Sequence, residues 1–140
     1  MSDDMGSPEK VAAAADAVID TINFNDDGMV AAIAQQFDSG EVLMMAWMNR
    51  DAIRETLKTG RVCYWSRSRG KLWRKGETSK QTQALKDFRW DCDADTVLIL
   101  VDQEGVACHT GRRNCFFNAV RDGELTEIAK AEIDPKDLYG

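Results

Sequence analysis

Apolar and polar positions along the chain alternate in short blocks, which predicts strands separated by polar turns and a few helices. Helical spacing of apolar residues predicts one helix over residues 8–20 and a second, capped by Asn49, that continues to Gly60. Predicted strands cover residues 29–37, 42–47, 62–65, 83–92, 96–101 and 116–120. Residues 66–71 have the composition of a polar loop, and we expect a short final helix near residues 125–133.

Several of these strands follow one another through turns such as residues 25–28, 38–40 and 102–105. Many hairpin connections and few helices indicate an α+β fold with a mainly antiparallel sheet. A length of 140 residues is natural for one domain. We therefore expect a flexible N-terminus over residues 1–10, disordered at least to residue 7, and a single domain over residues 11–140.

Charge and composition exclude several classes of protein. The net charge of −6 argues against a general nucleic-acid binder. No apolar run approaches the roughly 20 residues of a membrane span, and the acidic N-terminus lacks the basic start of a signal peptide. We therefore expect a cytoplasmic protein without a membrane partner. In a reducing compartment, the four cysteines indicate metal binding or catalysis before disulfides.

Three of the cysteines and the only histidine fall in two short segments, residues 90–95 and 108–115. Thiolates suit zinc, so Cys92, Cys108 and Cys115 are candidate ligands that would leave a fourth position open. Their wide spacing lacks the C-x-x-C pairs of a zinc ribbon and favours a site assembled by the tertiary or quaternary fold. The alternative is that they pack as small apolar residues, which is the better interpretation for Cys63.

The segment of residues 90–95 also contains three aspartates at alternate positions, Asp91, Asp93 and Asp95. In an extended backbone their carboxylates would share one face and repel each other unless a hard cation such as magnesium lay among them. The alternative is an acidic turn before a strand. His109 is a candidate zinc ligand, a general acid/base or a structural histidine, and its position does not separate these roles.

Lys and Arg are concentrated from Arg61 to Lys86, where Glu77 is the single acid. Arginine forks and hydroxyl donors are the groups that bind phosphate, and a Trp ring can stack on a base or sugar. The alternative is a solvated basic loop. The candidate substrate and phosphate contacts are Ser66, Arg67, Ser68, Trp73, Lys75, Thr78, Ser79, Arg112 and Arg113.

Five segments together resemble the phosphoribosyl-AMP cyclohydrolase family of histidine biosynthesis. They are residues 44–49 (MMAWMN), 64–69 (YWSRSR), 72–79 (LWRKGETS), 91–95 (DCDAD) and 108–115 (CHTGRRNC), and the match runs from about residue 30 to 117. One departure is Lys80-Gln81, where the family more often has glycine followed by a polar residue, and it concerns the shape of the turn after Ser79. Because the chain ends soon after the matching region, we expect no fused pyrophosphohydrolase domain of the kind some relatives carry.

The resemblance implies hydrolytic opening of the adenine ring of 1-(5-phosphoribosyl)-AMP between N1 and C6. It implies an intertwined homodimer of compact, mainly antiparallel subunits with a few helices. Each subunit would have one interface zinc, held by Cys92 of one chain and Cys108 and Cys115 of the other. The same resemblance assigns Asp91, Asp93 and Asp95 to magnesium and proton transfer to His109. Two rival hypotheses are a zinc-stabilised binding module without activity and a zinc hydrolase that acts on another nucleotide.

Overall fold

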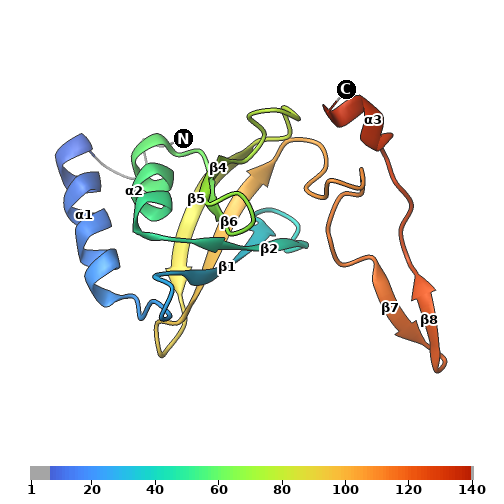
Figure 1. Ribbon diagram of the computed structural model, residues 1–140, viewed down its shortest axis with the longest axis horizontal. Helices are drawn as coiled ribbons and strands as arrows, with labels where there is room; N and C mark the ends of the chain where they lie inside the picture. The colour runs from blue at the N-terminus through green and yellow to red at the C-terminus, as the bar shows by residue number, and fades with distance from the viewer. Residues whose placement is uncertain (1–6, 140) are drawn as a thin grey trace.

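The structure, a computed structural model, describes residues 7–139 and has an α+β fold, as predicted. Its elements are α1 (Pro8–Thr21), β1 (Val30–Gln36), β2 (Val42–Met48), α2 (Arg50–Thr59), β3 (Cys63–Ser66), β4 (Lys71–Arg74), β5 (Gln83–Trp90), β6 (Thr96–Gln103), β7 (Asn118–Arg121), β8 (Glu124–Glu127) and α3 (Pro135–Tyr139). Six strands form one sheet in the order β4-β3-β2-β1-β6-β5, and β7 and β8 form a separate hairpin. Helices α1 and α2 lie side by side at the same side of the sheet (Figure 1).

Both predicted N-terminal helices are confirmed, and their ends follow from local chemistry. At the start of α1, the Ser7 hydroxyl accepts the Lys10 N–H at 3.3 Å. At the start of α2, Asn49 Oδ1 accepts the Ala52 N–H at 2.9 Å, and the helix ends at Gly60 in the left-handed conformation. Within the N-terminus expected to be flexible, residues 8–10 are helical, and residues 1–6 lie outside the described part.

The sheet is mainly antiparallel, as predicted, with one parallel pair. Strand β1 pairs antiparallel with β2 on one side and parallel with β6 on the other. Strand β5 then pairs antiparallel with β6, with a register shift between Leu85 and Asp87. This bulge explains why apolar and polar residues alternate imperfectly in the sequence of β5.

The loop expected over residues 66–71 is confirmed at residues 67–70, which turn between β3 and β4, whereas its end residues Ser66 and Lys71 belong to these strands. Strand β4 itself was not predicted. One expectation for local structure is wrong. The helix expected near residues 125–133 does not form. Instead Asp122 and Gly123 take positive φ angles of 52° and 77° in the turn of the β7–β8 hairpin. Asp-Gly is a strong hairpin signal, which the sequence interpretation overlooked, and the last helix lies further on, at Pro135–Tyr139.

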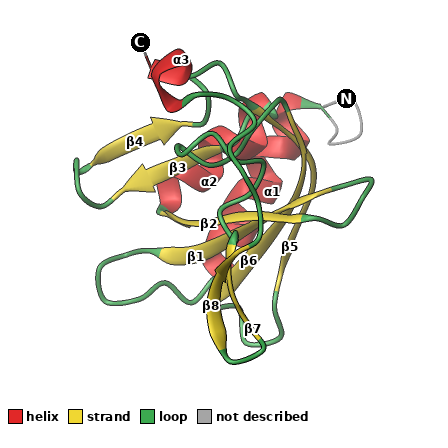
Figure 2. Cartoon of the chain, turned by 90° about the vertical axis from the view of Figure 1, so that its right-hand side faces the viewer, coloured by secondary structure: helices red, strands yellow, loops and turns green. Residues whose placement is uncertain are grey.

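One face of the sheet builds the hydrophobic core, which joins side chains of α1 and α2 to alternate residues of the strands. The opposite face carries a row of apolar residues in register, Met45 of β2, Ile33 of β1 and Leu98 of β6. This row is not fully covered, and Met45 is 41% exposed. The β7–β8 hairpin extends away from the sheet (Figure 1) and lies in front of it in the view turned by 90° (Figure 2). In this hairpin Val120 is 69% exposed and Leu125 is 93% exposed. Within residues 7–139, no helix combines the length and apolar character needed to cross a membrane.

Candidate active site

A cavity of about 670 Å³ opens beside the β3–β4 hairpin. It is formed by segments far apart in the sequence: Met45, Ala46 and Trp47 of β2, residues 65–69 of the hairpin, Trp73 of β4, residues 76–79 and His109. Six of the nine predicted substrate contacts line it, namely Ser66, Arg67, Ser68, Trp73, Thr78 and Ser79. The fold therefore brings the hydroxyl-rich basic segment and the single histidine to one place.

The hairpin turn orders the polar wall of this cavity. Ser66 Oγ accepts the Arg69 N–H at 3.3 Å and lies 3.4 Å from Ser68 Oγ. The Arg67 guanidinium lies 4.7 Å from the centre of the Trp47 ring, a cation–π contact. Hydroxyls, a guanidinium and an indole face together offer both anion donors and a stacking surface to a ligand.

The other three predicted contacts make different interactions. The Arg113 guanidinium donates to the carbonyls of Gln103 and Gly105 and pairs with Glu41. Arg112 pairs with Glu127 and lies 4.0 Å from the Phe117 ring centre. Lys75 is buried and lines a second cavity behind β4; burial lowers the pKa of its ammonium, against the opposing effect of the nearby Cys115 and Cys108 thiols.

A closed turn presents His109 to the cavity. The Ala107 N–H donates to the Arg113 carbonyl at 2.9 Å, and the Cys108 N–H to the Arg112 carbonyl at 3.1 Å. Gly111 within this turn has φ of 86°, and an added Cβ would lie 1.8 Å from the Ile133 carbonyl oxygen. Glycine is therefore required there by both conformation and space.

Two of the three candidate zinc ligands lie together. Although much of the Cys115 residue is exposed, its thiol is partly buried beside Cys108, and this burial together with Cys108 raises the pKa of Cys115 to about 12. Cys92 is exposed in the aspartate segment, and no group of three Cys or His ligand atoms forms within residues 7–139. Cys63 is fully buried in β3.

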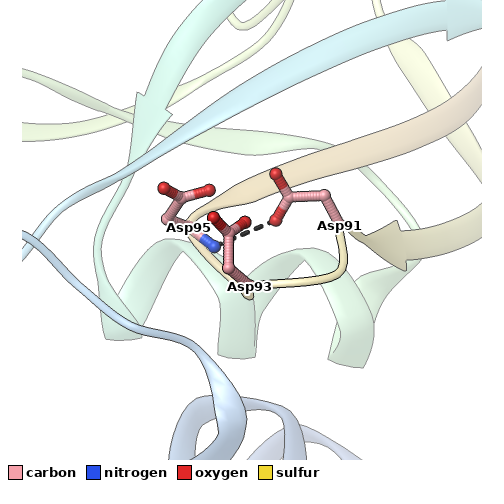
Figure 3. A group of neighbouring side chains, drawn as sticks. All are labelled: Asp91, Asp93 and Asp95. Atoms are coloured by element: carbon pink, nitrogen blue, oxygen red, sulfur yellow. Dashed lines mark hydrogen bonds between the residues drawn. The ribbon is translucent and has the colours of Figure 1, made fainter.

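The three aspartates converge, but not by the predicted route. They lie in a turn after β5 rather than on extended backbone, and Ala94 has φ of 60°. The Asp95 N–H donates to Asp91 Oδ1 at 3.0 Å (Figure 3). The Thr96 N–H donates to the same oxygen at 3.2 Å. One carboxylate oxygen from each aspartate lies within 4.8 Å of the others.

The electrostatics of this turn favour a cation. Hydrogen bonds and charge from the neighbouring Asp93 and Asp91 carboxylates raise the pKa of Asp95. For Asp91, desolvation acts upward, but hydrogen bonds from Asp95 and Thr96 outweigh it and hold the pKa below its usual range. Crowded carboxylates of this kind could bind a metal ion, because a bound cation relieves their repulsion.

Sequence reasoning missed a buried polar chain behind the cavity. The Tyr64 hydroxyl donates to Gln83 Oε1 at 2.7 Å, and Gln83 Nε2 donates to Gln103 Oε1 at 2.8 Å. Gln103 Nε2 in turn donates to the Val106 carbonyl at 3.2 Å, two residues before Cys108. The available signal was the presence of glutamines in strands that are otherwise buried, since buried amides need partners.

Comparison with known proteins identifies the family. The sequence model described as phosphoribosyl-AMP cyclohydrolase matches residues 44–117. A phosphoribosyl-AMP cyclohydrolase of Paramagnetospirillum magneticum is 67% identical over 123 residues, covering 88% of this chain and 93% of the relative. One of Alcanivorax borkumensis is 63% identical over 134 residues, covering 95% and 94%, and one of Rhodospirillum centenum is 62% identical over 128 residues, covering 91% and 96%. The chain belongs to the phosphoribosyl-AMP cyclohydrolase family and is a hydrolase of histidine biosynthesis.

Proposed function

We propose that this chain catalyses the third step of histidine biosynthesis, the zinc-dependent hydrolysis of the N1–C6 bond in the adenine ring of 1-(5-phosphoribosyl)-AMP. The observation that carries this proposal is the cavity in which His109 faces hydroxyl, guanidinium and indole groups. A substrate with two phosphates and a purine ring needs anion donors and a stacking surface close to a proton-transfer group.

The reaction defines what these residues do. Substitution at N1 makes the purine ring cationic, so C6 is electrophilic. When water adds to C6 and the N1–C6 bond breaks, the water oxygen becomes a carbonyl oxygen and loses both of its protons, of which one reaches the departing nitrogen and the other is released. His109 would carry these protons, because an imidazole exchanges protons near neutral pH. Ser66, Arg67 and Thr78 would hold phosphate oxygens while Trp73 stacks on a ring.

The thiols of Cys108 and Cys115 fit a zinc site. They lie close to each other, Cys108 directly precedes His109 in the chain, and thiolates are preferred zinc ligands. Cys92 of a second copy would complete the set, which is consistent with its separate, exposed position. When bound there, zinc supplies an acidified water for hydrolysis. Asp91, Asp93 and Asp95 would hold magnesium, for which clustered carboxylates are suitable ligands.

A homodimer would cover the apolar surfaces that a single chain leaves open. The row of Met45, Ile33 and Leu98 adjoins the cavity through Met45, and the extended β7–β8 hairpin exposes Val120 and Leu125. Contiguous exposed apolar residues of this kind mark association surfaces. Sedimentation of the purified protein tests this; a monomer at assay concentration would contradict it.

His109→Ala is the direct test of the proposed chemistry. We expect turnover of 1-(5-phosphoribosyl)-AMP to fall by about 10²- to 10⁴-fold, the usual contribution of general acid–base catalysis. Zinc content measured by atomic absorption should be unchanged. Unaltered turnover would remove His109 from the mechanism, and loss of zinc would make it a ligand instead.

A further inference from the structure

We propose that Gln81 is a positioning residue that fixes His109 relative to the opposite wall of the cavity. This inference rests on the role of His109 in the proposed function. The wall in question is residues 76–79, which contribute Thr78 and Ser79 to the cavity. Gln81 lies two residues after Ser79, the last residue of this wall, and its side chain reaches across to the segment that leads into His109.

Gln81 makes hydrogen bonds both to the wall of residues 76–79 and to the segment that leads into His109. On the near side, its N–H donates to Ser79 Oγ at 3.2 Å and its Nε2 donates to the Ser79 carbonyl at 3.1 Å. On the far side, its Oε1 accepts the Val106 N–H at 3.0 Å. Val106 is only 2% exposed, so its amide depends on a protein acceptor.

A second contact reinforces the same junction. Gln103 Nε2 donates both to the Gln81 carbonyl and to the Val106 carbonyl, each at 3.2 Å. Gly105 allows the close approach, since a Cβ at that position would lie 1.7 Å from Gln81 Oε1. The two walls are therefore joined through side-chain amides immediately before the turn that carries His109.

Loss of the Gln81 hydrogen bonds should displace the segment that carries His109 more than it displaces the wall of residues 76–79. Residues 76–80 have their own hydrogen bonds, from the Lys80 N–H to the Gly76 carbonyl at 2.8 Å and from the Glu77 N–H to the Arg74 carbonyl at 3.0 Å. The Val106 N–H, by contrast, donates to Gln81 Oε1. A displaced acid–base group lowers kcat, whereas an intact binding wall keeps KM.

The test uses Gln81→Met, which keeps the length of the side chain but removes both hydrogen bonds, and Gln81→Glu, which keeps the acceptor for the Val106 N–H. We expect kcat to fall about tenfold or more in Gln81→Met, with KM within about threefold, and Gln81→Glu to recover most of the loss. Gln35→Met is the matched control, because the Gln35 side-chain amide donates to the Gly40 carbonyl and does not line the cavity. If Gln81→Met fails to fold by circular dichroism, Gln81→Ala removes the same acceptor.

The decisive comparison places Gln81→Met in the His109→Ala background. If Gln81 acts through His109, the second substitution causes no further loss of kcat there. A multiplicative loss, or no rescue by Gln81→Glu, overturns the positioning role. Full kcat in Gln81→Met combined with a large loss in His109→Ala refutes this inference alone. Full kcat in His109→Ala refutes the proposed function of His109 and this inference with it.

Discussion

Replacement of Tyr64 by Phe isolates one hydrogen bond of the buried polar chain behind the cavity. Both partners of this bond, the Tyr64 hydroxyl and the Gln83 side chain, are fully buried. Burial raises the pKa of Tyr64, so the hydroxyl stays a proton donor at neutral and mildly alkaline pH. Phe keeps the ring and its contact with Trp73, whose ring centre lies 5.5 Å away.

The magnitude follows from the acceptor that is left behind. Gln83 Oε1 would be buried without its donor, which costs about 1–3 kcal/mol of unfolding free energy. For a chain of 140 residues, about 1 kcal/mol corresponds to roughly 3–4 °C in Tm, so we expect Tm to fall by about 3–10 °C. The assay is thermal unfolding followed by circular dichroism at one fixed protein concentration, since association shifts Tm.

A double-mutant cycle with Gln83→Leu assigns the loss to the bond. In the Gln83→Leu background the acceptor is gone, so Tyr64→Phe should cost little, and the coupling energy should be about 1–2 kcal/mol. A decrease in Tm of less than about 1 °C for Tyr64→Phe alone would refute the reasoning that this bond stabilises the chain. Losses of unfolding free energy that are fully additive in the double mutant would refute it as well.

Four further predictions follow from single features. Lys80 has φ of 67°, so Lys80→Gly should stabilise the protein by about 0.5–1 kcal/mol in urea unfolding; destabilisation would contradict the strain. Burial, with the charge of Glu55, raises the pKa of Cys63 from 9.0 to about 12. The neutral Cys63 thiol therefore contributes fully to the free energy of unfolding below pH 9, and this contribution declines by up to about 1.4 kcal/mol per pH unit toward pH 12. Cys63→Ala should reduce this decline with pH, and parallel plots of unfolding free energy against pH for the two proteins would exclude the effect. Asp93→Asn should raise the half-saturating magnesium concentration roughly tenfold, so an identical titration would count against the aspartate site. Cys108→Ala and Cys115→Ala should each lose bound zinc, and full zinc content in both would reject the ligand assignment.

Much of the fold could be predicted because its signals are local. Ser7 and Asn49 cap their helices through hydrogen bonds to residues three positions away, and the apolar run of β6 is buried as a strand. The register shift in β5 and the parallel pairing of β1 with β6 depend on tertiary contacts, which periodicity does not report. The misassigned helix near residues 125–133 reflects a local signal, Asp122-Gly123, that was present but overlooked.

The candidate site was also predictable only in part, because some of its features depend on tertiary contacts. Residues with distinctive chemistry, such as His109, Ser66 and Thr78, were identified from residue type and line one cavity. Arg112 and Arg113 have equally suitable chemistry but make contacts with Glu127 and Glu41, because carboxylates and carbonyls are the nearest partners in the fold. Gln81, Gln83 and Gln103 were missed because an amide side chain has no distinctive spacing, and its role depends on which backbone groups the fold leaves without partners.

The lysine at position 80 illustrates how a departure from the family pattern can be accommodated. Glycine, which the resemblance led us to expect there, takes positive φ freely, and Lys80 takes a positive φ of 67°. The Lys80 N–H still closes the turn onto the Gly76 carbonyl at 2.8 Å. The turn after Ser79 therefore forms and is closed by a hydrogen bond with lysine at this position, at a cost in backbone strain.

The most direct test of the proposed function is the opening of the purine ring of 1-(5-phosphoribosyl)-AMP by the purified protein, followed by absorbance. The reaction would be measured before chelation, after chelation, and after zinc and magnesium are restored. We predict that activity is lost on chelation and returns with the metals, and that the product has a cleaved N1–C6 bond. A folded, zinc-loaded protein that leaves this substrate unchanged would contradict the proposed function.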